Sequence, residues 1–446
     1  MIEVKGKYTT AKIMIDNVEE SCIKQIYEFI NHQAFTNSVA IMPDTHAGKG
    51  SVIGFTMEMT DKVIPNVVGV DIGCGMLSRN IGKHIDSNMA LIDQRIRQRV
   101  PMGREVHTRS GRPRDPWEFY DWNNVQQTVR KIDMRFGSNL SSKIPTHDKV
   151  NLLLERADAV GMDRSRFVNS VGTLGGGNHF IEFGEDEDKN IWITVHTGSR
   201  NFGKMVCEYW QNKNAKKKRK EAKADLRKEI KVLKKQYRGE ELGKKIQEAK
   251  DKNAAAETVD DLQWLEGEEM LGYLFDMALA QEYANANRRM IMKLIVSQVV
   301  VNDQSQSIKD RPNVIDNKET IQCIHNFIDF DDMIIRKGAI RSYENEKMII
   351  PFNMRDGLLI CEGKSNSEWN YSAAHGAGRV LSRSAAKRTL DQEDANKQME
   401  DAGIFTTNVP LDEAPDAYKD AKLVEEALEP TLKILKRVKP THNIKA

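Results

Sequence analysis

Five side chains able to bind metal ions lie beside glycine-rich turns or in short apolar runs of this sequence. They are Asp71, Cys74, His179, His196 and His325. Asp71 and Cys74 are three residues apart in the segment Val-Asp-Ile-Gly-Cys-Gly, where a predicted strand runs into a tight turn. Carboxylate, thiolate and imidazole groups are the donors that zinc and transition metals take in proteins. Each residue alone also fits a structural role, such as a buried cysteine or a turn-capping aspartate.

Five ligands exceed the three or four that one tetrahedral ion takes from a protein. We therefore predict two ions that share the thiolate of Cys74, because two close metals can hold an attacking and a leaving oxygen. Cysteine and histidine favour zinc, whereas a carboxylate beside a nucleotide phosphate favours manganese or magnesium. The residues themselves leave the metal open.

A further histidine, His375, lies in the segment Ala-His-Gly-Ala-Gly-Arg. The two glycines would let a phosphate approach the imidazole, and the arginine would neutralise its charge. Histidine can also act as a covalent nucleophile, and the alternative is an ordinary surface loop. The segment 48–51 lacks the upstream glycine of a phosphate-binding P-loop. The Lys-x-Asp-Gly motif of ordinary polynucleotide ligases does not occur either.

Short β-branched runs bounded by Gly, Pro or Asp predict the strands that position these residues. The predicted strands cover residues 39–42, 51–55, 67–70, 180–183, 191–195, 321–327, 347–352 and 358–361. We expect a helix through Cys22, Ile26 and Ile30 that starts at Asp16 or Asn17. A long buried helix is expected over 262–301, and the last 65 residues look largely helical until Pro440. These elements predict an α+β fold with one core of mixed sheets and surrounding helices.

The segment from Lys204 to Ala256 contains no proline and is rich in charged residues. Its apolar residues keep heptad spacing on both sides of a break at Arg238 and Gly239. They are Leu226, Ile230, Leu233 and Tyr237 before the break, and Leu242, Ile246 and Ala249 after it. This pattern predicts an inserted helical hairpin over 205–257 that divides a core of residues 1–204 and 258–446. The alternative is one solvated helix without a partner.

The predicted arm is strongly basic. Residues 213–252 hold 17 Lys and Arg against 7 Asp and Glu, whereas the whole chain has a net charge of +2. Such an arm could follow a nucleic-acid backbone, dock another protein or simply be solvated.

The rest of the composition excludes several classes of protein. The chain has 446 residues, 39% of them hydrophobic, and no apolar run approaches the roughly 20 residues of a membrane span. The N-terminus lacks an apolar signal region, so we expect a cytoplasmic protein without membrane association. Five scattered cysteines without a Cys-x-x-Cys pair argue against a disulfide framework or a zinc ribbon.

Taken together, these segments resemble the RNA-splicing ligase RtcB family. The matching stretches are residues 42–50, 68–76, 174–182, 196–200, 325–326 and 375–379, with the penultimate Lys445. The similarity runs from about residue 39 to the C-terminus, apart from the arm and residues 101–165. Ile324 stands where many relatives have a second histidine, so only His325 can be the ligand there.

The resemblance implies a GTP- and manganese-dependent ligase that joins RNA 3′-phosphate or 2′,3′-cyclic phosphate ends to 5′-hydroxyl ends. Cys74, His196 and His325 would bind one Mn²⁺, and Asp71, Cys74 and His179 the other. His375 is similar to the residue that becomes guanylylated, and Arg200 to an arginine near the reacting phosphate. The residues similar to the GTP contacts of the family are Asn178, Glu182, Asn326, Gly376, Ala377, Gly378, Arg379, Tyr418 and Lys445. Among these, the two asparagines would contact phosphates, Glu182 and Lys445 the guanine, and Tyr418 would stack on it.

We predict RNA contacts at two further places. Asp44 and His46 belong to the matching stretch 42–50, and Arg109 and Arg112 precede a run of aromatic residues, a mixture typical of single-strand contacts. An ordinary loop is the alternative for the two arginines. The charged arm lies outside the common core of the family, so the resemblance does not decide which RNA the protein would join. Splicing of tRNA and repair of damaged RNA are equally good roles. The competing function is a dinuclear metal-dependent phosphodiesterase acting on RNA ends, with the same ligands and no covalent step.

Overall fold

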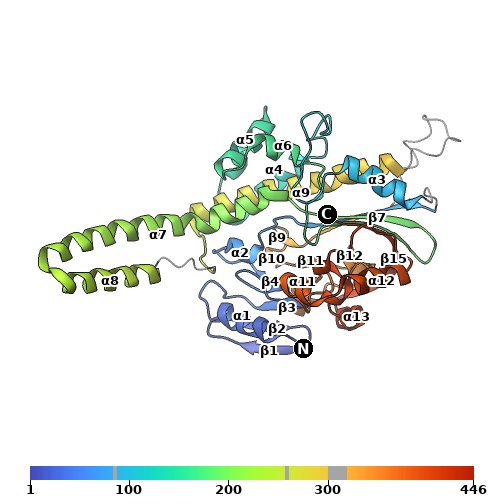
Figure 1. The fold of residues 1–446 in the computed structure, drawn as a ribbon. Helices are drawn as coiled ribbons and strands as arrows, with labels where there is room; N and C mark the ends of the chain where they lie inside the picture. The colour runs from blue at the N-terminus through green and yellow to red at the C-terminus, as the bar shows by residue number, and fades with distance from the viewer. Residues whose placement is uncertain (84–87, 257–260, 300–318) are drawn as a thin grey trace.

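Two sheets with helices packed around them form the body of the protein, and a helical hairpin projects from one side (Figure 1). The computed structural model describes residues 1–83, 88–256, 261–299 and 319–446. The mixture of helices with mostly antiparallel sheets confirms the predicted α+β class.

The first sheet contains six strands and takes most of them from the N-terminal part of the chain. Their order is β1 (Ile2–Lys5), β2 (Thr10–Ile13), β3 (Val39–His46), β4 (Ile53–Glu58), β10 (Ile334–Lys337) and β9 (Asn326–Asp329). Strands β2 and β3 pair in parallel, and α1 (Glu20–Ile30) makes the crossover between them. The buried residues Cys22, Ile26 and Ile30 repeat every four positions, so one face of α1 packs in the core.

The second sheet contains seven strands and holds most of the predicted site. Their order is β12 (Lys347–Pro351), β13 (Leu358–Gly363), β15 (Leu432–Ile444), β6 (Phe180–Glu185), β7 (Ile191–Thr197), β5 (Gly75–Gly82) and β8 (Thr320–Ile324). A small third sheet pairs β11 (Ala339–Arg341) with β14 (Ser372–Ala374). Because β8 and β9 belong to different sheets and His325 is the one residue between them, this histidine lies where the two large sheets meet.

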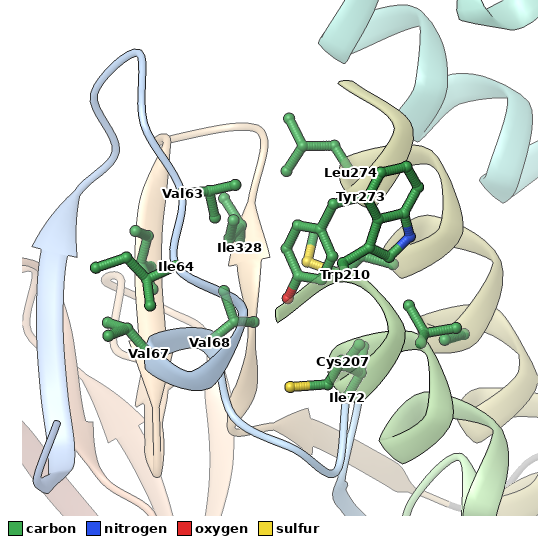
Figure 2. Close-up of a cluster of buried hydrophobic side chains, with 14 of the residues drawn as sticks. Val63, Ile64, Val67, Val68, Ile72, Cys207, Trp210, Tyr273, Leu274 and Ile328 are labelled. Carbon is green, nitrogen blue, oxygen red and sulfur yellow. The ribbon is translucent and has the colours of Figure 1, made fainter. Parts of the chain in front are cut away.

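Two long helices cover the sheets and meet the turn that carries Asp71. Figure 2 shows α2 (Pro65–Val68) and the residues after it packed against α7 (Arg200–Gln236) and α9 (Gly267–Val299), through Ile72, Cys207 and Tyr273. Buried Asp276 of α9 accepts hydrogen bonds of 2.7 Å from Arg156 and 2.8 Å from the indole of Trp210 in α7. This charge-assisted network fixes the base of α7 to α9.

Shorter helices complete the core. They are α3 (Met89–Arg99), α4 (Trp122–Phe136), α5 (Lys149–Ala159), α6 (Arg164–Asn169), α11 (Arg383–Thr389), α12 (Gln392–Asp401) and α13 (Ala421–Leu428). Single 3₁₀ turns occur at Leu140–Lys143, Ser367–Trp369, Leu411–Glu413 and Pro415–Ala417. Within the described ranges, no helix is both long and apolar enough to cross a membrane.

The predicted helical hairpin is present. Helix α7 continues from the core into the projecting arm, and α8 (Gly239–Ala256) returns beside it after a short break (Figure 1). Leu226, Ile230 and Leu233 are half-buried between exposed neighbours, and Ala249 of α8 is buried, as expected of a seam between two helices. The alternative of a single unpartnered helix is therefore wrong.

Three local predictions are wrong. Residues 67–70 do not form a strand, because Pro65 begins a short helix there instead. The first helix follows Glu19 rather than starting at Asp16 or Asn17. The C-terminal segment is helical only in part, since Leu432–Ile444 forms the long strand β15, which passes through Pro440 at a register shift.

The remaining element predictions are close to the structure. The long helix expected over 262–301 is α9, and residues 300–301 lie outside the described part of the chain. The strand expected over 321–327 is interrupted at His325, which lies between β8 and β9.

Candidate active site

The predicted metal ligands come together at one end of adjacent strands in the seven-stranded sheet. Strand β5 lies between β7 and β8, with Gly75 opposite both Thr197 and Ile324. Cys74 and His325 lie one residue beyond this register, and the backbone N–H of His325 donates to the carbonyl oxygen of Cys74 at 2.9 Å. The register therefore brings residues 74 and 325 together although 251 positions separate them.

Two groups of three ligands share Cys74. One contains Cys74, His196 and His325, the other Asp71, Cys74 and His179, and the ligand atoms of each group lie within 4.8 Å of one another. The Sγ atom of Cys74 is 3.4 Å from Nε2 of His196 and 3.5 Å from Nε2 of His179. The Nε2 atoms of His196 and His325 are 3.4 Å apart, and Nε2 of His179 is 3.0 Å from Oδ2 of Asp71. This is the arrangement expected of two ions with a common thiolate.

The charge states of the ligands fit divalent cations. Burial lowers the pKa of His196 and of His325 well below the usual value, so both imidazoles are neutral and offer a lone pair. Burial, reinforced by the charge of Asp71, raises the pKa of Cys74 well above that of a free thiol. A bound cation would oppose this rise in pKa, because a thiol that coordinates a metal ion loses its proton.

The two remaining ligands, Asp71 and His179, are oriented by neighbouring residues. Burial alone would raise the pKa of Asp71, but the hydrogen bond and charge of His179 outweigh it and the pKa is lowered. The Oδ1 atom of Asp71 is buried without a hydrogen-bond partner among the described residues. Nδ1 of His179 donates to the carbonyl oxygen of Leu174 at 2.9 Å, which leaves Nε2 free for a metal. The donor set therefore fits two divalent cations.

Glycine is required around this centre because the chain passes so close to it. A Cβ atom on Gly198 would lie 2.3 Å from Oδ1 of Asp71. A Cβ atom on Gly175, which has a φ of +86°, would lie 1.8 Å from the guanidinium of Arg200 and 2.7 Å from the ring of His179. Arg200 thus lies directly beside the candidate metal ligands, and its predicted role near a reacting phosphate stays a prediction.

Two hydrogen bonds hold the guanidinium group of Arg200 in place. Its Nε donates to Oγ1 of Thr173 at 2.9 Å and its Nη2 donates to the carbonyl oxygen of Gly103 at 3.0 Å. Its backbone has a φ of +57°, a left-handed conformation that costs a non-glycine residue roughly 1–3 kcal/mol. The packing around the start of α7 maintains this strain.

His375 connects the metal ligands to a cavity. The centroid of its ring is 4.6 Å from that of His325. Its Nδ1 atom is 2.7 Å from Oδ2 of Asp44, which is completely buried. Gly378 follows with a φ of +74°, and a Cβ atom there would lie 2.4 Å from the carbonyl oxygen of Asp44. The glycine therefore lets the loop after His375 pack directly on the Asp44 backbone.

The cavity has a volume of about 180 Å³ and opens to solvent at its mouth. Its lining includes eight predicted GTP contacts: Asn178, Glu182, Gly376, Ala377, Gly378, Arg379, Tyr418 and Lys445. His46, predicted as an RNA contact, also lines it, and burial lowers the pKa of this histidine to about 4. The lining residues that sequence reasoning missed are Phe180, Pro351, Phe352, Asn353, Met354, Arg383, Glu413 and Asn443.

Glu413 organises the far end of the cavity. This buried carboxylate accepts hydrogen bonds from the Tyr418 hydroxyl at 2.7 Å and from Nζ of Lys445 at 2.6 Å. The guanidinium of Arg379 lies over the Tyr418 ring, 4.9 Å from its centre. The sequence offered one indication that Glu413 lines the cavity, which is its position five residues before Tyr418. That indication does not reveal the contact with Lys445.

A second buried carboxyl group lies in the cavity wall. Glu182 is 4% exposed, and its Oε1 atom has no hydrogen-bond partner among the described residues. Burial, partly offset by the charge of Lys445, raises the pKa of Glu182 to about 8. An unpartnered polar atom of this kind is suited to pairing with a polar ligand.

Three predicted contacts lie elsewhere. The Asn326 amide donates to the carbonyl oxygen of Asp71 at 3.1 Å and accepts from the backbone of Gly338 at 3.0 Å, so it supports the metal-ligand turn and does not line the cavity. Arg109 is exposed and Arg112 half-buried in the loop before α4.

The aromatic residues that follow this loop are not free for stacking. Trp117 packs against Phe167 and Tyr283, and the hydroxyl of buried Tyr120 donates to the carbonyl oxygen of Leu279. An RNA contact by the two arginines stays a prediction.

Comparison with known proteins gives a consistent result. The family model described as tRNA-splicing ligase RtcB matches residues 25–446. The chain is 29% identical to the RNA-splicing ligase RtcB of Escherichia coli K12, over 94% of this chain and 92% of the relative. It is 27% identical to the tRNA-splicing ligase RtcB of Pyrobaculum aerophilum, over 87% and 83%. The match to the family model covers nearly the whole chain and includes the two ligand groups and His375, and the protein belongs to the RtcB family.

Proposed function

We propose that this protein is a GTP-dependent RNA ligase that joins RNA 3′-phosphate or 2′,3′-cyclic phosphate ends to 5′-hydroxyl ends. The observation that carries the proposal is the position of His375, between a pair of ligand groups suited to divalent cations and a cavity lined by polar and aromatic side chains. The names of the relatives, RNA- and tRNA-splicing ligases, support the substrate class.

The two ligand groups would hold two Mn²⁺ ions, which when bound would neutralise phosphate charge and polarise the phosphorus–oxygen bonds. The cavity would hold GTP, with its guanine near Glu182 and Lys445 and stacked on Tyr418. The loop 376–379 would surround the phosphates, because its two glycines allow close approach of the backbone. Asn178 would contact the same phosphates.

The first step would be attack of Nε2 of His375 on the α-phosphorus of GTP. A nitrogen–phosphorus bond forms, the α–β phosphoanhydride bond breaks, and pyrophosphate leaves. Asp44 would hold the ring through Nδ1 and stabilise the positive charge that develops on it, the part that a carboxylate takes beside a catalytic histidine. Arg200 would bind the RNA phosphate and offset the charge that accumulates there.

The GMP would then pass to RNA. An oxygen of the RNA 3′-phosphate attacks the phosphorus of the histidine-bound GMP and releases His375. The 5′-hydroxyl oxygen finally attacks the activated 3′-phosphate, its proton passes to solvent, and GMP leaves. A cyclic phosphate must first be opened by water to a 3′-phosphate.

A joining assay tests this function. Two RNA halves, one ending in a 2′,3′-cyclic phosphate and the other starting with a 5′-hydroxyl, should be joined only when both GTP and Mn²⁺ are present. Halves with a 3′-hydroxyl and a 5′-phosphate should not be joined. Consumption of the cyclic end without joining would support the dinuclear phosphodiesterase instead. Spliced tRNA and damaged RNA should be compared as substrates, and a cytoplasmic location is part of the same proposal.

A further inference from the structure

The projecting arm separates its charges onto different faces. In α7, Arg227, Lys231 and Lys234 follow one another at intervals of four and three residues, which places them on one face of the helix. All three side chains are exposed, and none forms an ion pair with another described side chain. We call these three positions the basic stripe.

Acidic residues of the same helix lie on the other side. Asp225 and Glu229 are each two residues from Arg227, which is about 160° around a helix of 3.6 residues per turn. Asp225 pairs with Lys228 at 3.0 Å, so it is engaged away from the stripe. The apolar seam that packs on α8 occupies a third side, at Leu226, Ile230 and Leu233. Three exposed basic side chains of α7 are thus aligned on a face of their own.

The periodicity of this line suits a chain of phosphates. Intervals of three and four residues correspond to about 4.5 and 6 Å along the helix axis, and the three positions span about 10.5 Å. Phosphates in one strand of duplex DNA recur about every 3.4 Å along the helix axis, and at a spacing of this order the stripe could meet several phosphates of a nucleic-acid strand. Lysine is depleted in protein–protein interfaces, which argues against a protein partner on this face.

Helix α7 also connects the stripe to the reacting centre. The helix starts at Arg200, beside the metal ligands, and reaches Arg227 without a break. The 27 residues between them correspond to about 40 Å. At the phosphate spacing of one strand of duplex DNA, about 12 nucleotides would cover that distance.

From this geometry we infer that the basic stripe binds the RNA backbone about 40 Å from the joining site. The inference rests on the proposed RNA-ligase function for the identity of its ligand. It adds an RNA-binding surface outside the catalytic core, which would favour long RNA over short oligonucleotides.

The test measures RNA binding apart from joining. The triple variant Arg227→Ala, Lys231→Ala, Lys234→Ala is compared with the wild type on single-stranded RNAs of 5 and 30 nucleotides that end in 3′-hydroxyls and cannot be joined. The control variant Lys5→Ala, Lys24→Ala, Lys433→Ala removes the same charge from exposed positions of the core. Circular dichroism checks that the arm stays helical.

On the 30-mer, the triple variant should bind several-fold more weakly at 0.1 M salt. The slope of log K against log salt should fall by about 2, since each lost single-strand phosphate contact lowers it by about 0.7. The control variant should keep the slope of the wild type, and binding of the 5-mer should be unchanged in both.

The inference would be overturned if the triple variant kept the wild-type salt slope on the 30-mer. It would also be overturned if the variant lost as much affinity for the 5-mer as for the 30-mer. An unchanged slope together with loss of an oligomer would assign the arm to protein docking. Failure of the two proposals can be told apart. If the wild type joins RNA but the slope does not depend on the stripe, only this inference fails. If the slope depends on the stripe but no joining occurs, only the proposed ligase fails.

Discussion

The Nδ1 atom of His375 lies 2.7 Å from Oδ2 of Asp44, although 331 residues separate them in the chain. The same carboxylate oxygen accepts a hydrogen bond of 3.2 Å from the backbone N–H of His375. Asp44 is completely buried, so it cannot rotate away to solvent. The contact places the carboxylate against Nδ1 and leaves Nε2 as the nucleophile of the proposed reaction.

Asp44→Asn should slow guanylylation without emptying the metal sites. An amide cannot stabilise the imidazolium that forms on attack, and comparable losses at catalytic histidines amount to roughly 10²–10⁴-fold in rate. The rate of label incorporation from GTP into protein measures the effect, and bound metal is measured on the same samples. An unchanged rate would remove Asp44 from the mechanism.

Cys74→Ala should lose metal from both ligand groups, whereas His179→Ala and His325→Ala should each disturb one. The reason is that the thiolate belongs to both groups and each histidine to one. Purified variants are dialysed against Mn²⁺ and analysed for metal content and by titration calorimetry. Two ions bound to Cys74→Ala with undiminished affinity would contradict the shared ligand. Zinc in the purified protein would not, because these ligands bind zinc more tightly than manganese.

Glu182→Gln should change how stability depends on pH. The pKa of Glu182 is about 8 in the folded protein and near 4.5 when unfolded, so between these values the folded state holds a proton that the unfolded state has released. The contribution of Glu182 to the free energy of unfolding is therefore fully present below pH 4.5 and is lost as the pH rises to about 8. The loss is on the order of 3 kcal/mol between pH 5 and 8, at 1.36 kcal/mol per pKa unit.

Glutamine resembles the protonated acid and does not titrate, so the variant should gain stability relative to the wild type at pH 8 compared with pH 5. Urea unfolding of ligand-free protein at the two pH values measures the difference. A difference in unfolding free energy that is the same at both pH values would show that Glu182 is already ionised in the folded protein.

The sequence was informative where function depends on residue type and short spacing. The five candidate metal ligands and the glycine-flanked His375 could be selected by residue type and spacing, and the resemblance to the RtcB family supplied the roles proposed for them. The arm could be predicted because its heptad pattern is local. By contrast, Asp44 was assigned to RNA, since nothing in its neighbourhood indicates a contact with a residue 331 positions away.

The pairing of strands that are far apart in the sequence accounts for the other differences between the predicted and the observed contacts. Glu413 meets Lys445 only because β15 pairs with β6 and carries the C-terminus into the cavity wall, and the sequence suggested helix for this region. Asn326 supports the Asp71 turn because β9 leaves His325 toward the other sheet. Such pairings depend on how whole strands align, which no local pattern of apolar residues specifies.

The central claim is that His375 carries GMP during the reaction. The most direct measurement is incubation of the protein with Mn²⁺ and GTP labelled at the α-phosphate, followed by denaturing electrophoresis and peptide mapping. The account predicts label on the peptide containing His375, released by acid and stable to alkali as a phosphoramidate, and no label on His375→Ala. Retention of an acid-labile label by His375→Ala, or joining of RNA by that variant, would contradict it.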